Sequence, residues 1–96
     1  DLLEYAAVME VTSAPDPERL PPGMVHVVVP AATYAVFTHR GDPKTLDHTV
    51  NYIYSTWLAQ SGRRHSYGAD LEIYGSEYEH DSSSSVMSYA IPLVDD

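Results

Sequence analysis

One segment of the chain, between Asp42 and Gly62, carries a complete set of helix signals and limits what the rest can fold into. Asp42 is a favourable N-cap residue, and Pro43 suits the first helical position, where its missing N–H is not needed. Gly62 supplies the left-handed residue that often ends a helix. Between these ends, apolar residues recur at helical spacing, at Leu46, Val50, Ile53 and Trp57, widened by Tyr54 and Leu58. The pattern predicts one amphipathic helix of about 18 residues, or about 27 Å.

Short runs of strand-favouring residues surround this helix. They are residues 4–11, 24–29 and 33–39 before it, and 71–74 and Val86–Leu93 after it. Residues 12–23 are rich in proline and form a loop, and Pro30 breaks the pattern between the second and third runs. Pro92 predicts an edge strand, because proline lacks the N–H that a central strand uses. The order of elements predicts an α+β fold, an antiparallel β-sheet with one long α-helix packed on it.

Length and composition predict a single small domain of 96 residues. Residues 1–22 are interpreted as a leading strand and a proline-rich linker, and residues 23–96 as a β-α-β-β module. The chain has no cysteine, and no apolar run approaches the roughly 18 residues that cross a bilayer. We therefore expect a cytoplasmic protein that makes no membrane contact.

Charge narrows the range of partners. Fourteen acidic and five basic side chains give a net charge of −9. Such a chain repels phosphate backbones and attracts cations, so nucleic-acid binding by this chain is not expected. Tyrosine is the other excess, with eight copies beside one tryptophan and one phenylalanine. Aromatic faces hold organic cations, especially with a carboxylate nearby, although ordinary packing accounts for most of these rings.

A single carboxylate, Glu72, interrupts the apolar run of residues 71–74. Strand alternation places such a glutamate on a solvated face by default. A buried carboxylate is costly, and it is usually tolerated where a cation or a proton is handled. Periodicity leaves both interpretations open and by itself favours the solvated one.

Sequence motifs for other kinds of chemistry are absent. The five histidines have no H-E-x-x-H or C-x-x-C companion, and the serines form no G-x-S-x-G. The glycines are scattered at turns instead of forming a phosphate-binding loop. The sequence therefore predicts no metal, no cofactor and no nucleophilic serine.

A set of longer stretches forms a more specific pattern. In order along the chain they are Pro30-Ala-Ala-Thr-Tyr-Ala-Val-Phe-Thr-His-Arg-Gly41, Asn51-Tyr-Ile-Tyr-Ser-Thr-Trp-Leu58, Gln60-Ser-Gly62, Leu71-Glu-Ile-Tyr74 and Ala90-Ile-Pro-Leu93. Together they resemble the GyrI-like small-molecule-binding domains, which are also the effector-binding domains of AraC-type and MerR-type multidrug regulators. The similarity runs from about Gly23 to Leu93, in the family's order and spacing, and no single stretch carries it alone.

The resemblance implies a ligand and a site. Family members often bind lipophilic aromatic cations, and the acidic residue of the strand motif, here Glu72, faces the charge of the ligand. The candidates for the walls of the groove are Trp57, Tyr54, Tyr74, Tyr34 and Phe37. Alternation places Tyr74 on the face of Glu72, whereas Tyr34 and Phe37 are an odd number of residues apart and cannot both face the ligand. Structural packing remains an equal interpretation for each ring.

The resemblance covers only half of the family's arrangement. A family domain of this SHS2 type repeats its β-α-β-β module about a pseudo-twofold axis, with the ligand groove between the two copies. This chain is similar to the second module, preceded by what resembles the final strand of the first, residues 4–11. Either the chain is truncated or two chains pair across a true twofold axis. We expect a homodimer, since one helix on a short sheet leaves an apolar face exposed.

Three functions follow as alternatives. The leading one is a binding module for small lipophilic aromatic cations, such as a drug or an effector, in a groove with a central glutamate. The second is a hydrolase of reactive small molecules on the same fold, with Glu72 as general base and a tyrosine as acid. The third is a protein-binding module, because the family includes gyrase inhibitors and the acidic surface suits a basic partner.

Overall fold

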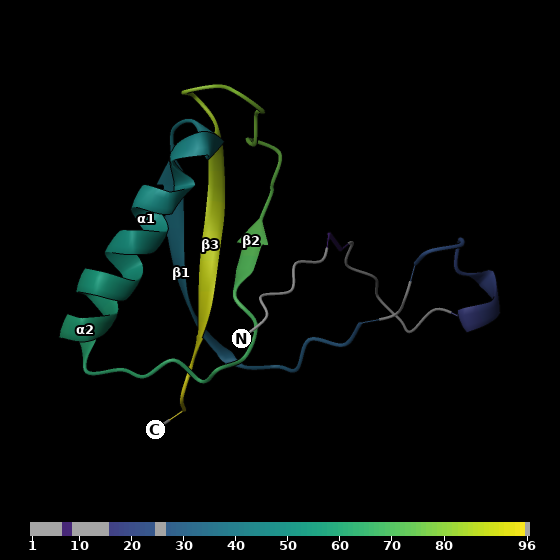
Figure 1. The fold of residues 1–96 in the computed structure, drawn as a ribbon, viewed down its shortest axis with the longest axis horizontal. Helices are drawn as coiled ribbons and strands as arrows, with labels where there is room; N and C mark the ends of the chain where they lie inside the picture. Colours follow the sequence, from purple (N-terminus) through teal and green to yellow (C-terminus); the bar gives the residue numbers. More distant parts are fainter. Residues whose placement is uncertain (1–6, 9–15, 25–26, 96) are drawn as a thin grey trace.

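The computed structural model describes residues 7–8, 16–24 and 27–95 of the chain. Within them an antiparallel sheet carries one long helix on one face, which confirms the predicted α+β fold (Figure 1). A short 3-10 turn, η1 (Pro17–Arg19), lies on the segment that precedes the sheet. No helix in the described part of the chain is long and apolar enough to cross a membrane.

The helix is continuous from Pro43 to Ser61, although its hydrogen bonding changes along its length. A 3-10 turn η2 (Pro43–Thr45) leads into α1 (Leu46–Tyr52), a wider π-helical segment η3 (Ile53–Trp57) and α2 (Leu58–Ser61). The Asp42 carboxylate accepts a hydrogen bond from the backbone N–H of Lys44 at 2.9 Å. Gly62 ends the helix in the left-handed conformation, with a φ of 75°. Both predicted ends of the helix are confirmed.

The sheet has the strand order β1-β3-β2. Strand β3 (Val86–Leu93) lies at the centre and pairs antiparallel with β1 (Thr33–Arg40) on one side and with β2 (Leu71–Ile73) on the other. The strands predicted at 33–39, 71–74 and Val86–Leu93 are confirmed. Of the strand predicted at residues 4–11, only Ala7 and Val8 lie among the described residues, and neither belongs to a strand.

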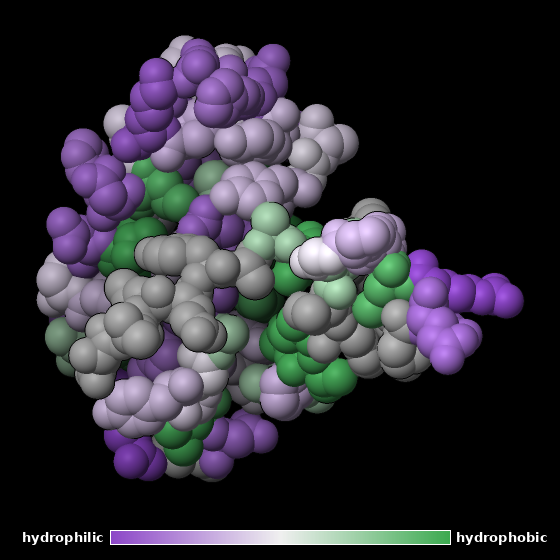
Figure 2. All heavy atoms as spheres, turned by 45° about the vertical axis from the view of Figure 1, so that its right-hand side comes forward, coloured by the Kyte–Doolittle hydropathy of each residue, from purple (hydrophilic) through white to green (hydrophobic). Residues whose placement is uncertain are grey.

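The strand predicted at residues 24–29 is wrong for the residues that are described. Met24 and residues 27–29 belong to no strand, and Val28 is 72% exposed; Val25 and His26 lie outside the described residues. A valine run favours a strand only where a neighbouring strand and a packed face are available, and Pro30 interrupts pairing here. Hydrophobic atoms of this part of the chain are visible at the surface, between the sheet and a polar tip (Figure 2).

The prediction that Pro92 marks an edge strand is also wrong, because β3 is the central strand. The carbonyl oxygen of Pro92 accepts a hydrogen bond from the Ser66 N–H at 3.0 Å. Its nitrogen faces the same side, as both groups of a strand residue do. On that side the pairing of β2 has already ended, with Leu71 opposite Ala90. The missing N–H therefore removes no ladder hydrogen bond.

The core lies between the helix and the sheet. Ile53 of the helix is fully buried and packs with Ile91 and Leu93 of β3. Ala35, Phe37, Trp57, Leu58 and Tyr89 surround this group. The rings of Phe37 and Trp57 meet edge to face, with centroids 5.0 Å apart. This contact joins the helix to β1.

A buried histidine, His39 of β1, fastens the start of the helix to the sheet. Its Nδ1 lies 2.7 Å from the Thr49 hydroxyl, and its Nε2 lies 3.1 Å from the carbonyl oxygen of Asp42. A neutral ring protonated on Nε2 donates to that carbonyl and accepts from Thr49, so both nitrogens are satisfied. The turn that carries Lys44 is thereby held in place.

Candidate functional site

A row of three side chains crosses the helix side of the sheet. The strand register sets Phe37 opposite Tyr89, and Tyr89 opposite Glu72, so all three point to the same face. Trp57 packs on Phe37, but the helix lies over β1 and does not extend across β2 (Figure 1). Glu72 is therefore on the helix side and yet exposed. Of the two interpretations left open by periodicity, the solvated one is correct for the exposure of Glu72. Its side chain nevertheless points to the side of the sheet that carries the helix.

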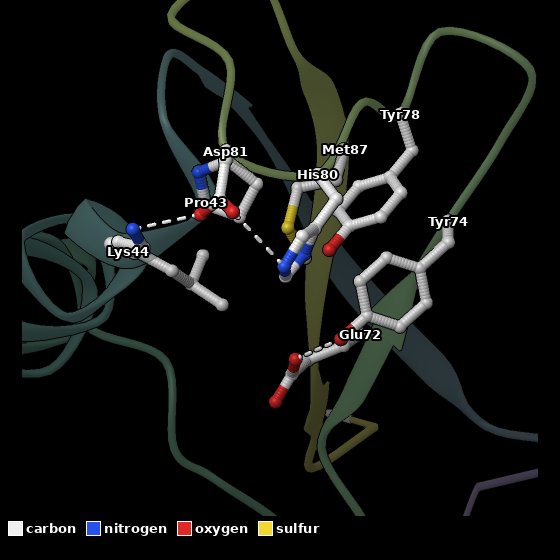
Figure 3. A pocket seen from close by; sticks show the side chains of 9 residues that line it. Pro43, Lys44, Glu72, Tyr74, Tyr78, His80, Asp81 and Met87 are labelled. Atoms are coloured by element: carbon white, nitrogen blue, oxygen red, sulfur yellow. Dashed lines mark hydrogen bonds and ion pairs between the residues drawn. The ribbon is translucent and has the colours of Figure 1, made fainter.

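A pocket of about 260 Å³ lies beside Glu72, between the start of the helix, β2 and the loop that leads to β3 (Figure 3). Its lining residues are Pro43, Lys44, Leu46, Glu72, Tyr74, Tyr78, His80, Asp81 and Met87. This volume lies below the roughly 300–1,000 Å³ of drug-binding cavities, so it suits a small ligand or one part of a larger one.

One oxygen of Glu72 is occupied by a neighbouring tyrosine. The Tyr74 hydroxyl donates a hydrogen bond to Glu72 Oε1 at 2.5 Å, because the two residues are two positions apart and share a face. This hydrogen bond, together with partial burial and the charges of Glu72 and Tyr78, raises the pKa of Tyr74 to about 12. Among the described residues, no hydrogen bond or ion pair engages Glu72 Oε2. The hydrogen bond from Tyr74 orients the carboxylate through Oε1.

Two aromatic rings and a thioether form the apolar wall of the pocket. Tyr74 and Tyr78 meet edge to face, with centroids 4.7 Å apart and an interplanar angle of 69°. Met87 reaches the pocket from the central strand and is itself buried. Aromatic faces and a polarizable sulfur suit the apolar groups of an organic cation.

The pocket also contains its own cation, Lys44. Its Nζ lies 2.8 Å from Asp81 Oδ1, and His80 Nε2 lies 3.2 Å from Asp81 Oδ2. Figure 3 shows this ion pair on one side of the pocket and the Glu72–Tyr74 pair on the other. The charges of Lys44 and Asp81 offset each other, so Glu72 supplies the excess negative charge of the lining.

A second carboxylate, Asp70, lies on the same side of the sheet, and both of its oxygens have hydrogen-bonding partners. The hydroxyls of Tyr54 and Tyr89 both donate to its Oδ2, and His65 Nε2 lies 2.7 Å from its Oδ1. Burial raises the pKa of Tyr54 and of Tyr89 above the ordinary value for tyrosine, and the hydrogen bonds to Asp70 raise both further. This cluster joins the helix, the loop before β2 and the central strand. None of its residues is among those that line the pocket.

Metal binding has no support in the described part of the chain. No group of three or more His, Cys, Asp or Glu side chains is arranged there to hold an ion.

The residues singled out in the sequence fall into separate places. Glu72 and Tyr74 line the pocket. Tyr54 binds Asp70, and Phe37 and Trp57 pack in the core. Tyr34 pairs with Pro92 and, by alternation from Phe37, points to the opposite face of the sheet.

Several residues of the pocket were not identified from the sequence. Tyr78, His80 and Asp81 come from a polar loop, and Lys44 comes from the capping turn of the helix. Loop residues carry no periodicity, so only the path of the chain brings them to Glu72. Met87 could have been identified from the sequence, because it alternates with Tyr89 and Ile91 along one strand and therefore shares their face.

The chain is similar to one family of ligand-binding domains and to one curated regulator. Residues 2–94 match a family described as the GyrI-like small molecule binding domain. The chain is also similar to the transcriptional regulator BrlR of Pseudomonas aeruginosa, with 40% identity over 76 residues. The aligned part covers 77% of this chain and 28% of the regulator, so the chain spans less than a third of that protein.

Proposed function

Because the chain belongs to the family of GyrI-like small molecule binding domains, we propose that its pocket binds small lipophilic aromatic cations beside Glu72. The family match confirms the resemblance noted in the sequence and supports a small-molecule ligand. The finer assignment rests on one observation. An oriented carboxylate with an available oxygen stands at the side of a pocket that is walled by Tyr74, Tyr78 and Met87.

Physical chemistry favours an organic cation over other small ligands. A cation gains from the Glu72 carboxylate and from the tyrosine faces, whereas an anion meets a chain with a net charge of −9. A hydrated metal ion would gain little from the apolar wall. A molecule with one aromatic ring and one quaternary ammonium group has a charge and a size that suit the pocket.

The test compares benzyltrimethylammonium with benzyl tert-butyl ether, an uncharged molecule of similar shape, by isothermal titration calorimetry. Binding of the cation alone is expected, and Glu72→Gln should weaken it by about 1–3 kcal/mol, or about five- to 150-fold. Glu77→Gln is the matched control, because it removes the same charge from the loop outside the pocket lining. Equal affinities of the wild type and Glu72→Gln would remove Glu72 from the site.

The biological role that we propose is sensing or sequestering of such a ligand. Similarity to a transcriptional regulator supports an effector-binding role, with the ligand as the signal. The cytoplasmic location expected from the sequence stays a prediction.

We also propose that two copies of the chain form a homodimer. Val36 of β1 and Ile73 of β2 are 60% and 45% exposed, and both point away from the helix. A second copy would cover such apolar side chains, which are otherwise unfavourable at a surface.

A hydrolase is the second candidate, because a carboxylate and a tyrosine hydroxyl are hydrogen-bonded in one pocket. Glu72 would act as general base and Tyr74, which keeps its proton at neutral pH, as general acid. The discriminating measurement is product formation from an electrophilic small molecule such as an epoxide. Turnover that is lost in both Glu72→Gln and Tyr74→Phe would favour the enzyme, and its absence in the wild type would favour simple binding.

A further inference from the structure

We propose that Asp81 sets the cation affinity of the pocket by holding Lys44, the pocket's own ammonium group, away from Glu72. The inference rests on the proposed cation site and concerns its regulation. Lys44 is an internal competitor for the carboxylate that the ligand needs, and Asp81 keeps that competitor occupied.

The position of Lys44 follows from its place in the fold. It is the second residue of the turn that opens the helix, and its backbone N–H is bound by the capping carboxylate of Asp42. The buried ring of His39 holds the same turn on the sheet through the Asp42 carbonyl. The backbone at Lys44 is therefore fixed, whereas its four-carbon side chain is flexible and lines the pocket together with Glu72.

Asp81 is placed to receive this side chain. Its backbone is in the left-handed region, with a φ of 59°, which aspartate tolerates better than most residues. Its Oδ1 lies 2.8 Å from Lys44 Nζ, and its Oδ2 lies 3.2 Å from His80 Nε2. Both oxygens are thus directed at basic groups of the same pocket.

Removal of Asp81 would leave Lys44 with one other carboxylate in the pocket lining, which is Glu72. Glu79 is nearby in the sequence, but it lies outside the lining and its Oε2 accepts hydrogen bonds from Ser82 and Ser84. Glu72 Oε2 is engaged by no described residue. An ammonium group released from Asp81 would therefore pair with the oxygen that the ligand is proposed to use.

A simpler role for Asp81 predicts different effects of substitutions on cation affinity. Asp81 is itself negative and lines the pocket, so its charge alone would attract a cation without any involvement of Lys44. In that case the effects of changing Asp81 and Lys44 are independent and their factors multiply. In the proposed arrangement the two residues are coupled, since Lys44 competes more strongly when Asp81 is missing.

The experiment is a double-mutant cycle on the whole chain, with benzyltrimethylammonium as the ligand and calorimetry at low ionic strength as the readout. Asp81→Asn should weaken binding about two- to fivefold, the range of an exposed ion pair. Lys44→Met in the Asp81→Asn background should restore the wild-type affinity or exceed it. Lys44→Met alone should give a smaller gain. Arg19→Met is the control, because it removes the same charge outside the pocket lining.

An equal gain from Lys44→Met in both backgrounds would overturn the proposal. If Asp81→Asn does not fold, Asp81→Gly replaces it, since glycine adopts the left-handed conformation without strain. Failure of the proposed function looks different. A wild-type chain that binds no cation, or that binds it without Glu72, removes the site itself, whereas a Glu72-dependent site with uncoupled Lys44 and Asp81 removes only this inference.

Discussion

At the scale of single residues, tyrosine hydroxyls hold two carboxylates, Glu72 and Asp70, on the helix side of the sheet near β2. Tyr74 binds Glu72, while Tyr54 and Tyr89 bind Asp70. Each phenol O–H donates a hydrogen bond to a carboxylate, so the fold favours the protonated form of the tyrosine. The pKa values of all three tyrosines are raised for this reason, in addition to burial.

Stability should therefore fall at alkaline pH. The pKa of Tyr74 is raised to about 12 in the folded chain from an ordinary value of 10.0, so the unfolded chain loses this proton first. The contribution is complete below a pH of about 10 and is lost as the pH rises to about 12. Urea unfolding across this range should show the decline, with a shallower slope in Tyr74→Phe. Tyr67→Phe is the control, because Tyr67 is 94% exposed, and the same change in slope there would contradict this account.

At the scale of elements, the end of the helix depends on one backbone conformation. Gly62 has a φ of 75°, and among the described residues nothing beyond its chain neighbours and the adjacent helix backbone lies within 4 Å of an added Cβ. Gly62→Ala should therefore cost about 1–2 kcal/mol of unfolding free energy through backbone strain alone, without a steric clash. Chemical denaturation measures this cost.

Gly75→Ala offers the matched comparison. Gly75 also has open space around a Cβ, but its φ is not in the left-handed region. This substitution should be neutral or slightly stabilising, because alanine restricts the unfolded chain. A similar loss in both variants would show that the left-handed conformation is not the cause.

Some features of these elements could be predicted from the sequence, and others could not. The helix ends at Asp42 and Gly62 and the strand Val86–Leu93 could be predicted, because capping residues and local propensity determine them. The strand order could not, since it depends on contacts between distant segments. Pro92 was therefore misjudged as an edge residue, when only the end of β2 makes it acceptable in the central strand.

The candidate site also contains residue pairs that the sequence indicates and pairs that it does not. Glu72 and Tyr74 share a face by alternation, which a sequence shows directly. Lys44 and Asp81 meet through a capping turn and a loop, and no local pattern indicates that pairing. Tyr54 lies on the apolar stripe of the helix, yet its hydroxyl is directed to Asp70, a residue just before a strand.

At the scale of the whole molecule, association and ligand binding are separate questions. Light scattering should give the mass of two chains if the proposed homodimer forms. Val36→Asp should then yield the mass of one chain, because a charge on the face away from the helix opposes its burial. Ser83→Asp is the control, because it adds the same charge at an exposed position in the loop before β3. A wild-type chain with the mass of one copy would contradict the proposed homodimer. It would not bear on the proposal that the pocket binds a cation.

The contact between Trp57 and Phe37 has a practical consequence for optical studies of this protein. Trp57 is the sole indole of the chain, and it packs in the core while the residues that line the pocket do not include it. Its fluorescence should report loss of the fold and remain silent when a cation enters the pocket beside Glu72. A ligand that changes this emission without unfolding the chain would instead be located against the helix stripe.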